Sequence, residues 1–128
     1  MNLLRSGRIC ATVATRDLDR ARVFYEQKLG LAVALADERR GVYYRAADGT
    51  TLNLYERDVD PPAQSVATFL VDDLSAVMTE LRERGVTFEE YDEPDLKTID
   101  GVYTDDTGFA VAWCEDDDGN VLGFEQLP

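Results

Sequence analysis

Hydrophobic and polar positions follow the same order in two stretches of the chain. Residues 13–33 (VATRDLDRARVFYEQKLGLAV) and 67–88 (ATFLVDDLSAVMTELRERGVTF) each read as a strand, an acidic cap, an amphipathic helix, a glycine and a second strand. The apolar residues of each predicted helix recur at helical spacing and form one stripe: Leu18, Ala21, Phe24, Tyr25 and Leu29 in the first, Leu74, Val77, Met78 and Leu81 in the second. The pattern therefore predicts two copies of one supersecondary unit.

The ends of both predicted helices carry the expected signals. Asp17 is placed to cap the first helix, and Asp72 or Asp73 to cap the second, by accepting bonds from free amides. Gly30 and Gly85 suit left-handed C-caps. The first helical leucines are 56 residues apart and the glycines 55, so the two registers differ by one residue.

The similarity continues beyond the helices. ADGTTLNLYER (47–57) resembles DDGNVLGFEQ (117–126), and Asp-Gly is a strong hairpin signal. We expect an α+β fold of two tandem βαβββ modules in one domain spanning 1–128, joined by a linker at Pro61-Pro62. The predicted ranges are: module one about 8–57, with strands at 8–15, 31–37, 40–47 and 50–56; linker about 58–64; module two about 65–127, with strands at 65–71, 86–90, 100–105, 109–115 and 121–127.

One helix per small sheet covers only one sheet face, so the other face needs the second module, a partner chain or a ligand. We expect a pocket on that face. The polar segment 89–101 between predicted strands is of the kind that forms a lid or a dimer contact.

The charge composition of the chain limits the classes of molecule that it is expected to bind. The 128 residues include 26 acids, 13 bases and no histidine, giving a net charge of −13. Nucleic acid and anionic membrane surfaces are disfavoured as partners, because both need basic patches. The acidic surface suits solubility or the attraction of cationic ligands. Cys10 and Cys114 are too few for a disulfide framework, and no signal peptide or membrane-spanning run is evident, so we expect a cytoplasmic protein.

The segment EDDDGN (115–120) raises the question of a metal loop. A helix-loop-helix calcium site needs glycine at its sixth position and glutamate at its twelfth. Counted from Asp116, Gly119 is fourth and Leu127 is twelfth. We therefore predict a turn between two strands, with its acidic side chains mostly in solvent.

Three segments in this order resemble the vicinal oxygen chelate superfamily of glyoxalases, extradiol dioxygenases and bleomycin-resistance proteins: DLDRARVFYEQKLGL (17–31), VDDLSAVMTELRERGV (71–86) and AWCEDDDGNVLGF (112–124). The resemblance implies sheets that form a cupped surface around a ligand site, usually in a homodimer. Family metalloenzymes hold a divalent ion at positions that fall here on Cys10, Asn53, Val66 and Gly123. Because two of these lack a side-chain donor, we expect neither a metal nor another cofactor.

Strand alternation and this resemblance place eight candidate ligand-binding residues on the cup: Cys10, Thr12, Asn53, Tyr55, Thr68, Tyr103, Trp113 and Glu125. Alternatives remain open for several of them. Cys10 also fits an inert thiol, Asn53 a structural hydrogen bond, and Trp113 the core or a dimer interface. Tyr55 and Glu125 also fit surface positions at strand ends.

The function we predict is metal-independent binding of a small molecule, including sequestration of a cationic antibiotic. A metal-free lyase or isomerase is the alternative, with Glu125, Cys10 or a tyrosine doing acid–base work, although the spacing singles out no catalytic residue. A metal-dependent glyoxalase or dioxygenase and a ligand-free interaction module are the remaining interpretations.

Overall fold

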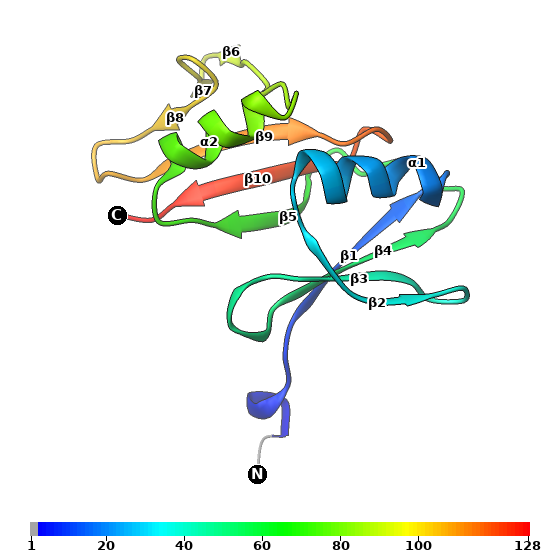
Figure 1. The fold of residues 1–128 in the computed structure, drawn as a ribbon. Helices are drawn as coiled ribbons and strands as arrows, with labels where there is room; N and C mark the ends of the chain where they lie inside the picture. Colours follow the sequence, from blue (N-terminus) through cyan, green and yellow to red (C-terminus); the bar gives the residue numbers. More distant parts are fainter. Residues whose placement is uncertain (1–2) are drawn as a thin grey trace.

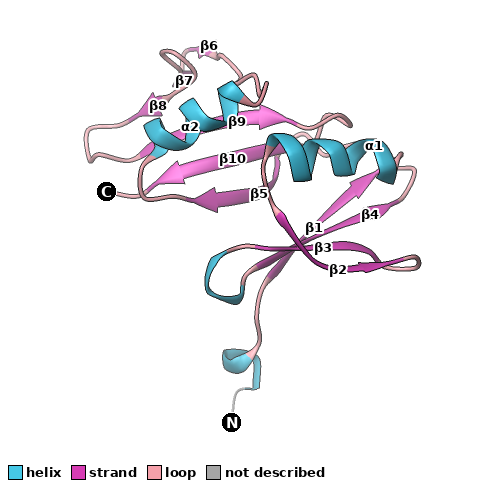
Figure 2. Cartoon of the chain, in the orientation of Figure 1, coloured by secondary structure: helices cyan, strands magenta, loops and turns pink. Residues whose placement is uncertain are grey.

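Each half of the chain forms a four-stranded sheet that carries one helix (Figures 1 and 2). The computed structural model describes residues 3–128. After a short 3-10 turn, η1 (Leu3–Ser6), the first module comprises the following elements: β1 (Cys10–Thr15), α1 (Leu18–Val23), η2 (Phe24–Lys28), β2 (Ala32–Asp37), β3 (Gly41–Arg45), η3 (Ala47–Gly49) and β4 (Thr51–Glu56). The strand order is β1-β4-β3-β2, with β1 and β4 parallel.

The second module repeats this arrangement with a longer insertion after its helix. Its elements are β5 (Ser65–Leu70), α2 (Leu74–Glu83), β6 (Asp92–Glu93), β7 (Leu96–Lys97), β8 (Tyr103–Thr104), β9 (Ala110–Glu115) and β10 (Val121–Gln126). The order β5-β10-β9-β8 matches the first sheet, and β5 and β10 are parallel. The predicted α+β architecture of two βαβββ modules is confirmed. No helix in residues 3–128 is long and apolar enough to cross a bilayer.

Position-by-position equivalence between the modules is visible in the hydrogen bonds. Thr12 lies opposite Asn53 in the first sheet, and Thr68 lies opposite Gly123 in the second. The amide of Leu18 donates to Glu56 Oε1 at 3.2 Å, and that of Leu74 donates to Gln126 Oε1 at 2.8 Å. An offset of 56 residues therefore relates the first strands and helices, and an offset of 70 relates the last turns and strands.

The helix signals act as the sequence predicts, with one addition. Asp17 and Asp73 cap α1 and α2 by accepting the amides of Arg20 and Ala76. Gly30 and Gly85 follow the helices with φ of 75° and 95°, which a side chain would strain. The additional feature is η2, a π-helical turn in which the Leu29 amide donates to Phe24 O at 2.9 Å. This wide turn holds the extra residue that separates the two registers.

A continuous apolar core lies between the helices and the sheets. Its largest fully buried side chains include Tyr25, Tyr44, Leu54, Met78 and Leu122. The rings of Tyr25 and Tyr44 stack with centroids 6.0 Å apart. Leu54 belongs to the first sheet and Leu122 to the second, and both lie in the same core. Burial of this shared core therefore stabilises the packing of both modules together.

The EDDDGN segment is a turn, as predicted, but its acidic side chains are not all in solvent. Asp116 is only 7% exposed and accepts four hydrogen bonds. Tyr25 Oη of the first module donates at 2.6 Å and Asn120 Nδ2 at 2.9 Å. Two backbone amides, those of Asp118 and Asn120, complete the set. The prediction of a solvated tip is wrong for this residue, because a buried carboxylate is stable only when its oxygens are satisfied.

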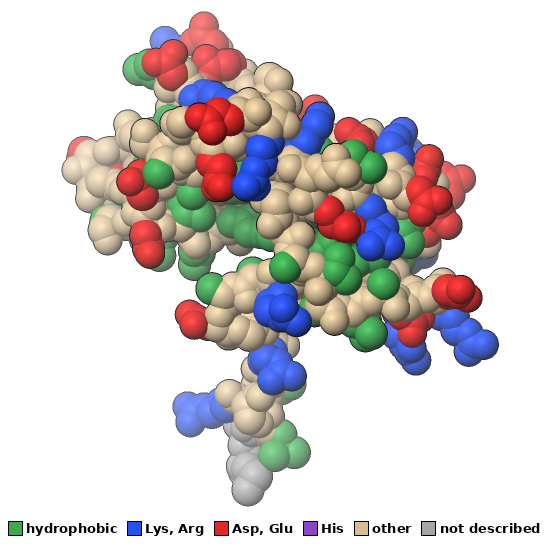
Figure 3. Space-filling model, in the orientation of Figure 1, with side chains coloured by type: hydrophobic (Ala, Val, Ile, Leu, Met, Phe, Trp, Pro, Cys, Tyr) green, Lys and Arg blue, Asp and Glu red, His purple; other side chains and the backbone are tan. Residues whose placement is uncertain are grey.

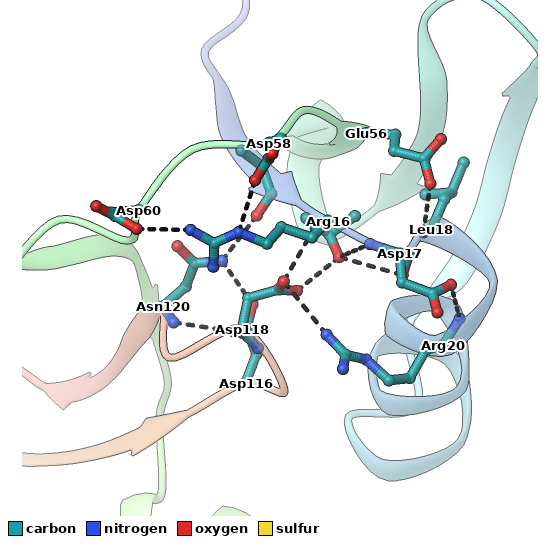
Figure 4. Close-up of polar contacts among 12 residues, drawn as sticks. Arg16, Asp17, Leu18, Arg20, Glu56, Asp58, Asp60, Asp116, Asp118 and Asn120 are labelled. Atoms are coloured by element: carbon teal, nitrogen blue, oxygen red, sulfur yellow. Dashed lines mark hydrogen bonds and ion pairs between the residues drawn. The ribbon is translucent and has the colours of Figure 1, made fainter.

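Asp118 ties the same turn to the end of β1 (Figure 4). Its carboxylate accepts Thr15 Oγ1 at 2.6 Å and the Arg16 amide at 3.0 Å, and Arg20 Nη2 lies 3.3 Å away. Asn120 Nδ2 also donates to Ala14 O at 2.9 Å. We call this contact of turn 116–120 with residues 14–16 and α1 the closed junction. It joins the modules through partners about a hundred residues apart in sequence.

The predicted strand at 86–90 is wrong. Only Phe88 forms a bridge there, antiparallel to Cys114, and the chain then leaves the sheet. The polar segment 89–101 instead folds into the β6–β7 hairpin, in which Asp92 pairs with Lys97. The Phe88 side chain is buried against Phe124, and the Glu89 amide donates to Trp113 O at 2.8 Å, so a short contact with β9 replaces the strand.

Candidate functional site

The sheet face opposite the helices carries the candidate residues. In β1 and β4 the residues directed at the helices are buried, as Val13 and Leu54 show, while Thr12 on the alternate face is exposed. In β9 and β10 the same alternation sends Cys114 and Leu122 to the core and leaves Trp113 and Glu125 half-buried on the other face. This second face is the cup.

Four of the eight candidates surround one hollow on the second module. Thr68, Tyr103, Trp113 and Glu125 line a depression of about 300 Å³ together with Ser65, Leu96, Phe109 and Val111. The glycine at position 123 lets Thr68 and Trp113 pack closely against β10, since a Cβ there would lie 3.2 Å from Thr68 Oγ1 and 3.7 Å from Trp113 Cδ1. The hollow has an apolar, aromatic floor and one carboxylate among these eight residues.

Aromatic and acidic groups continue from the hollow along β9. The Tyr91 ring meets the Trp113 ring edge-on, with centroids 5.5 Å apart. Burial raises the pKa of Glu89, and the nearby Glu115 carboxylate raises it further. Burial also raises the pKa of Tyr91, helped by Glu89 and Glu115. Crowded carboxylates beside aromatic faces produce a negative potential that favours cations.

The other four candidates lie on the first module. Cys10 is half-buried and its Sγ donates to Ala11 O at 3.4 Å, while Thr12 is exposed and Tyr55 half-buried. Asn53 is buried and its Nδ2 donates to Arg40 O at 3.0 Å and Val42 O at 3.4 Å. The structure thus gives Asn53 the structural partner that the sequence left open: it fastens the β2–β3 turn.

The family's metal positions do not form a metal site in this chain. The Asn53 amide is engaged by the β2–β3 turn, and the space beside Gly123 is filled by Thr68 and Trp113. Val66 offers no donor atom. Across residues 3–128, no group of three or more His, Cys, Asp or Glu side chains is arranged to hold a metal ion. The donor set of these positions is therefore unsuited to a transition metal.

Several residues around the hollow were not predicted as site residues from the sequence. Leu96 belongs to the hairpin in segment 89–101, which the sequence left as a lid or a dimer contact. Tyr91 and Glu89 also come from this segment. Alternation from Phe88, which is buried against β9, places Glu89 on the cup side, whereas no alternation reaches Tyr91.

The comparisons with known proteins agree with this fold. The family model described as Glyoxalase/Bleomycin resistance protein/Dioxygenase superfamily matches residues 8–124. A search of the curated proteins found no match. A glyoxalase/bleomycin resistance protein from Catenulispora acidiphila is similar in structure, with 25% identity, a TM-score of 0.72, and coverage of 94% of this chain and 98% of that one.

Two further structures share the fold at lower identity. An integron cassette protein from the Halifax Harbour sewage outfall metagenome has 20% identity and a TM-score of 0.71 over 95% of this chain and 99% of its own. The lactoylglutathione lyase of Agrobacterium tumefaciens has 18% identity and a TM-score of 0.69 over 94% and 93%. With a family model matched along nearly its whole length, this chain belongs to the glyoxalase/bleomycin resistance protein/dioxygenase superfamily.

Proposed function

We propose that the protein is a metal-independent binding protein that holds a cationic small molecule in the hollow of its second module. The observation that carries the proposal is the lining of that hollow, where Trp113 and Tyr103 lie beside Glu125. An aromatic face and a carboxylate together recognise an organic cation, the face through its quadrupole and the carboxylate through its charge.

Charge elsewhere on the chain supports this assignment. Glu89, next to the bridge at Phe88, has its carboxylate close to that of Glu115 at the end of β9, and the whole chain carries −13. A surface of this sign draws cations toward it over a distance set by ionic strength. Sequestration of a basic antibiotic fits these features, because it needs tight binding and no reacting group.

We expect the working form to be a cytoplasmic homodimer. The edge strand β2 exposes almost its whole length, with Val33 at 38% and Leu35 at 54% exposure. An exposed apolar edge strand is suited to pairing with another chain. Sedimentation equilibrium of the wild type and of Leu35→Glu measures this: a monomeric wild type would contradict it.

Trp113 supplies the readout for the ligand, since it is the only tryptophan in the chain. We expect a metal-free basic glycopeptide antibiotic, or an aminoglycoside, to change Trp113 fluorescence saturably and to release heat in calorimetry. Glu125→Gln should weaken binding about tenfold, the value of one charge-assisted hydrogen bond. Added salt should weaken the wild type more than the variant.

Glu38→Gln is the matched control. Glu38 is an exposed carboxylate in the β2–β3 turn, so its loss changes net charge by the same amount without touching the hollow. Equal weakening in both variants would assign the effect to overall charge and remove the hollow from the proposal. Absence of heat with either drug class at high protein concentration would refute cation binding.

A further inference from the structure

The contact between the modules has a second copy, and it is built differently. Turn 46–50 is the equivalent of turn 116–120, and the end of β5 is the equivalent of the end of β1. In this second turn, Ala46 stands in the place of Asp116, and Thr50 in the place of Asn120. The two groups at the centre of the closed junction are therefore missing.

The receiving side has changed as well. At the positions of Thr15 and Arg16 the second module has Val71 and Asp72, and at the position of Tyr25 it has Leu81. Asp48 is the equivalent of Asp118. Its expected partners are Val71, which has no hydroxyl, and Asp72, which carries a carboxylate where the first module has a guanidinium. Within residues 3–128, the hydrogen bonds of Thr50 stay inside its own turn: its amide and Oγ1 donate to Ala47 O, and its carbonyl oxygen accepts the Ala46 amide.

A cavity lies where the polar contact is absent. It measures about 490 Å³, within the usual range of small-molecule pockets. Its walls come from both modules and are apolar: Ala11, Leu31, Tyr44, Leu52, Ala67 and Phe69. At its edge, Ile9 and Leu70 are 85% and 66% exposed. We call this cavity, bounded by turn 46–50 and residues 67–70, the open junction.

Basic side chains stand at one end of the open junction. Arg45 lines it, and the Arg8 side chain lies against Gly49 in the same turn. Neither arginine forms an ion pair within residues 3–128, although the chain has twice as many acids as bases. Figure 3 shows basic side chains gathered where the N-terminal segment leaves the first module. Asp48 is the acidic residue of the lining, and it makes no ion pair with Arg45 there.

From these observations we infer that the open junction binds a small molecule with an apolar body and one anionic end. The walls take the apolar body out of water, which is favourable in proportion to the area covered. Arg45 meets the anionic end through a charge-assisted hydrogen bond. The open junction and the cationic-ligand hollow share one lining residue, Thr68, and their other lining residues differ. Their ligands have opposite charges.

Two fluorescent probes that differ in one group test this assignment. 8-Anilinonaphthalene-1-sulfonate is an aromatic anion, and N-phenyl-1-naphthylamine is the same body without the sulfonate. We expect both to bind once per chain. Arg45→Ala should weaken the sulfonate about tenfold and leave the neutral probe unchanged. Arg39→Ala, which removes an exposed arginine in the β2–β3 turn, should change neither.

Filling the cavity should remove both probes. Ala67→Phe places a ring inside the walls, and Ala47→Trp, on the exposed turn, covers the opening without entering the core. Undiminished binding of both probes in a folded Ala47→Trp variant would overturn the proposal. So would displacement of the sulfonate by the cationic drugs that bind the hollow, because that would merge the two sites. Decanoate, an aliphatic monocarboxylate, should displace the sulfonate.

One protein occupant gives a distinct result. Leu3 and Leu4 of a second copy, 73% and 86% exposed in this chain, would compete with the probes only as the protein concentration rises. Probe binding that falls with concentration and is restored by Leu3→Ser with Leu4→Ser would assign the open junction to that segment and overturn the small-molecule proposal.

Discussion

The two junctions between the modules occupy equivalent places in a duplicated fold, yet one is filled by side chains and the other contains a cavity. In the closed junction a buried carboxylate, Asp116, accepts four hydrogen bonds. In the open junction its place is taken by Ala46, and about 490 Å³ remains between apolar walls. A few side chains, with no change in strand order, separate a structural contact from a candidate binding site.

The two junctions also differ in the interactions that stabilise them. Hydrogen bonds to a buried carboxylate are strong because the group has no water to replace a lost partner. Where no side chain fills the space between apolar walls, the atoms of those walls lose van der Waals contacts instead. The closed junction therefore fixes the modules together, and the open junction leaves room for a ligand to contribute the missing contacts.

The largest effect is expected from Asp116→Ala. It leaves Tyr25 Oη and the amides of Asp118 and Asn120 without this acceptor, and Asn120 Nδ2 with Ala14 O alone, and should lower the free energy of unfolding by about 3 kcal/mol. Urea denaturation followed by circular dichroism measures the loss. Asp117→Ala, in the same turn but exposed, should change stability by less than about 0.5 kcal/mol. Equal losses in both variants would contradict the role of the buried network.

Much of this fold could be predicted from the sequence, because its signals are local. The place before an apolar stripe predicts Asp17 as one cap and Asp72 or Asp73 as the other, which the structure resolves to Asp73, and the alternation along β4 and β10 predicts the faces of Asn53 and Glu125. The burial of Asp116 could not be predicted. Its partner Tyr25 is 91 residues away, and only the packed fold brings them together.

The candidate site was predictable only in part for the same reason. Glu125 follows from alternation, whereas the sequence left the face of Trp113 open, and Tyr91 and Leu96 come from a polar segment that follows the bridge at Phe88. The open junction could not be predicted either, since its walls come from strands of both modules. Once the structure is known, the sequence explains this cavity, because Ala46 stands at the position equivalent to Asp116 and Val71 at the position equivalent to Thr15.

A matched pair of substitutions compares the two turns directly. Asp118→Asn weakens the acceptance of Thr15 Oγ1 and the Arg16 amide, and should cost about 1 kcal/mol of unfolding free energy. Asp48→Asn, the equivalent change in the open junction, should cost less than about 0.5 kcal/mol, because Asp48 has no such donors and asparagine tolerates its φ of 56°. Similar midpoints in urea for the two variants would show that the junctions do not differ in this way.

The smallest effect concerns the floor of the open junction and depends on pH. Arg22 Nε and Tyr44 Oη both donate to Glu26 Oε2, at 2.7 Å and 2.8 Å. The hydrogen bond from Arg22 lowers the pKa of Glu26 below its ordinary value of 4.5, and that from Tyr44 adds to the lowering. A lowered pKa in the folded state means that this stabilisation is present above about pH 4.5 and is lost as the pH falls through the lower, folded value.

Unfolding measured at pH 7 and at pH 3 tests this sign. Glu26→Gln should lower stability at pH 7 by less than about 1 kcal/mol and should match the wild type more closely at pH 3. Glu38→Gln, at an exposed position, should leave the pH profile unchanged. If the stability difference between the wild type and Glu26→Gln were larger at pH 3 than at pH 7, the hydrogen bonds of Glu26 would not stabilise the folded state in this way.

The wide turn at Phe24–Lys28 has a consequence for how the two copies stay alike. The first copy has one residue more than the second between its helix start and its glycine, yet Thr12 pairs with Asn53 as Thr68 pairs with Gly123, and the register shift in the second pairing lies at the start of β10, between Val121 and Leu122. The surplus is taken up within five residues and never reaches a ladder of paired strands. Helices of a repeated unit can thus vary in length independently, while the strands that form the cup keep their alignment.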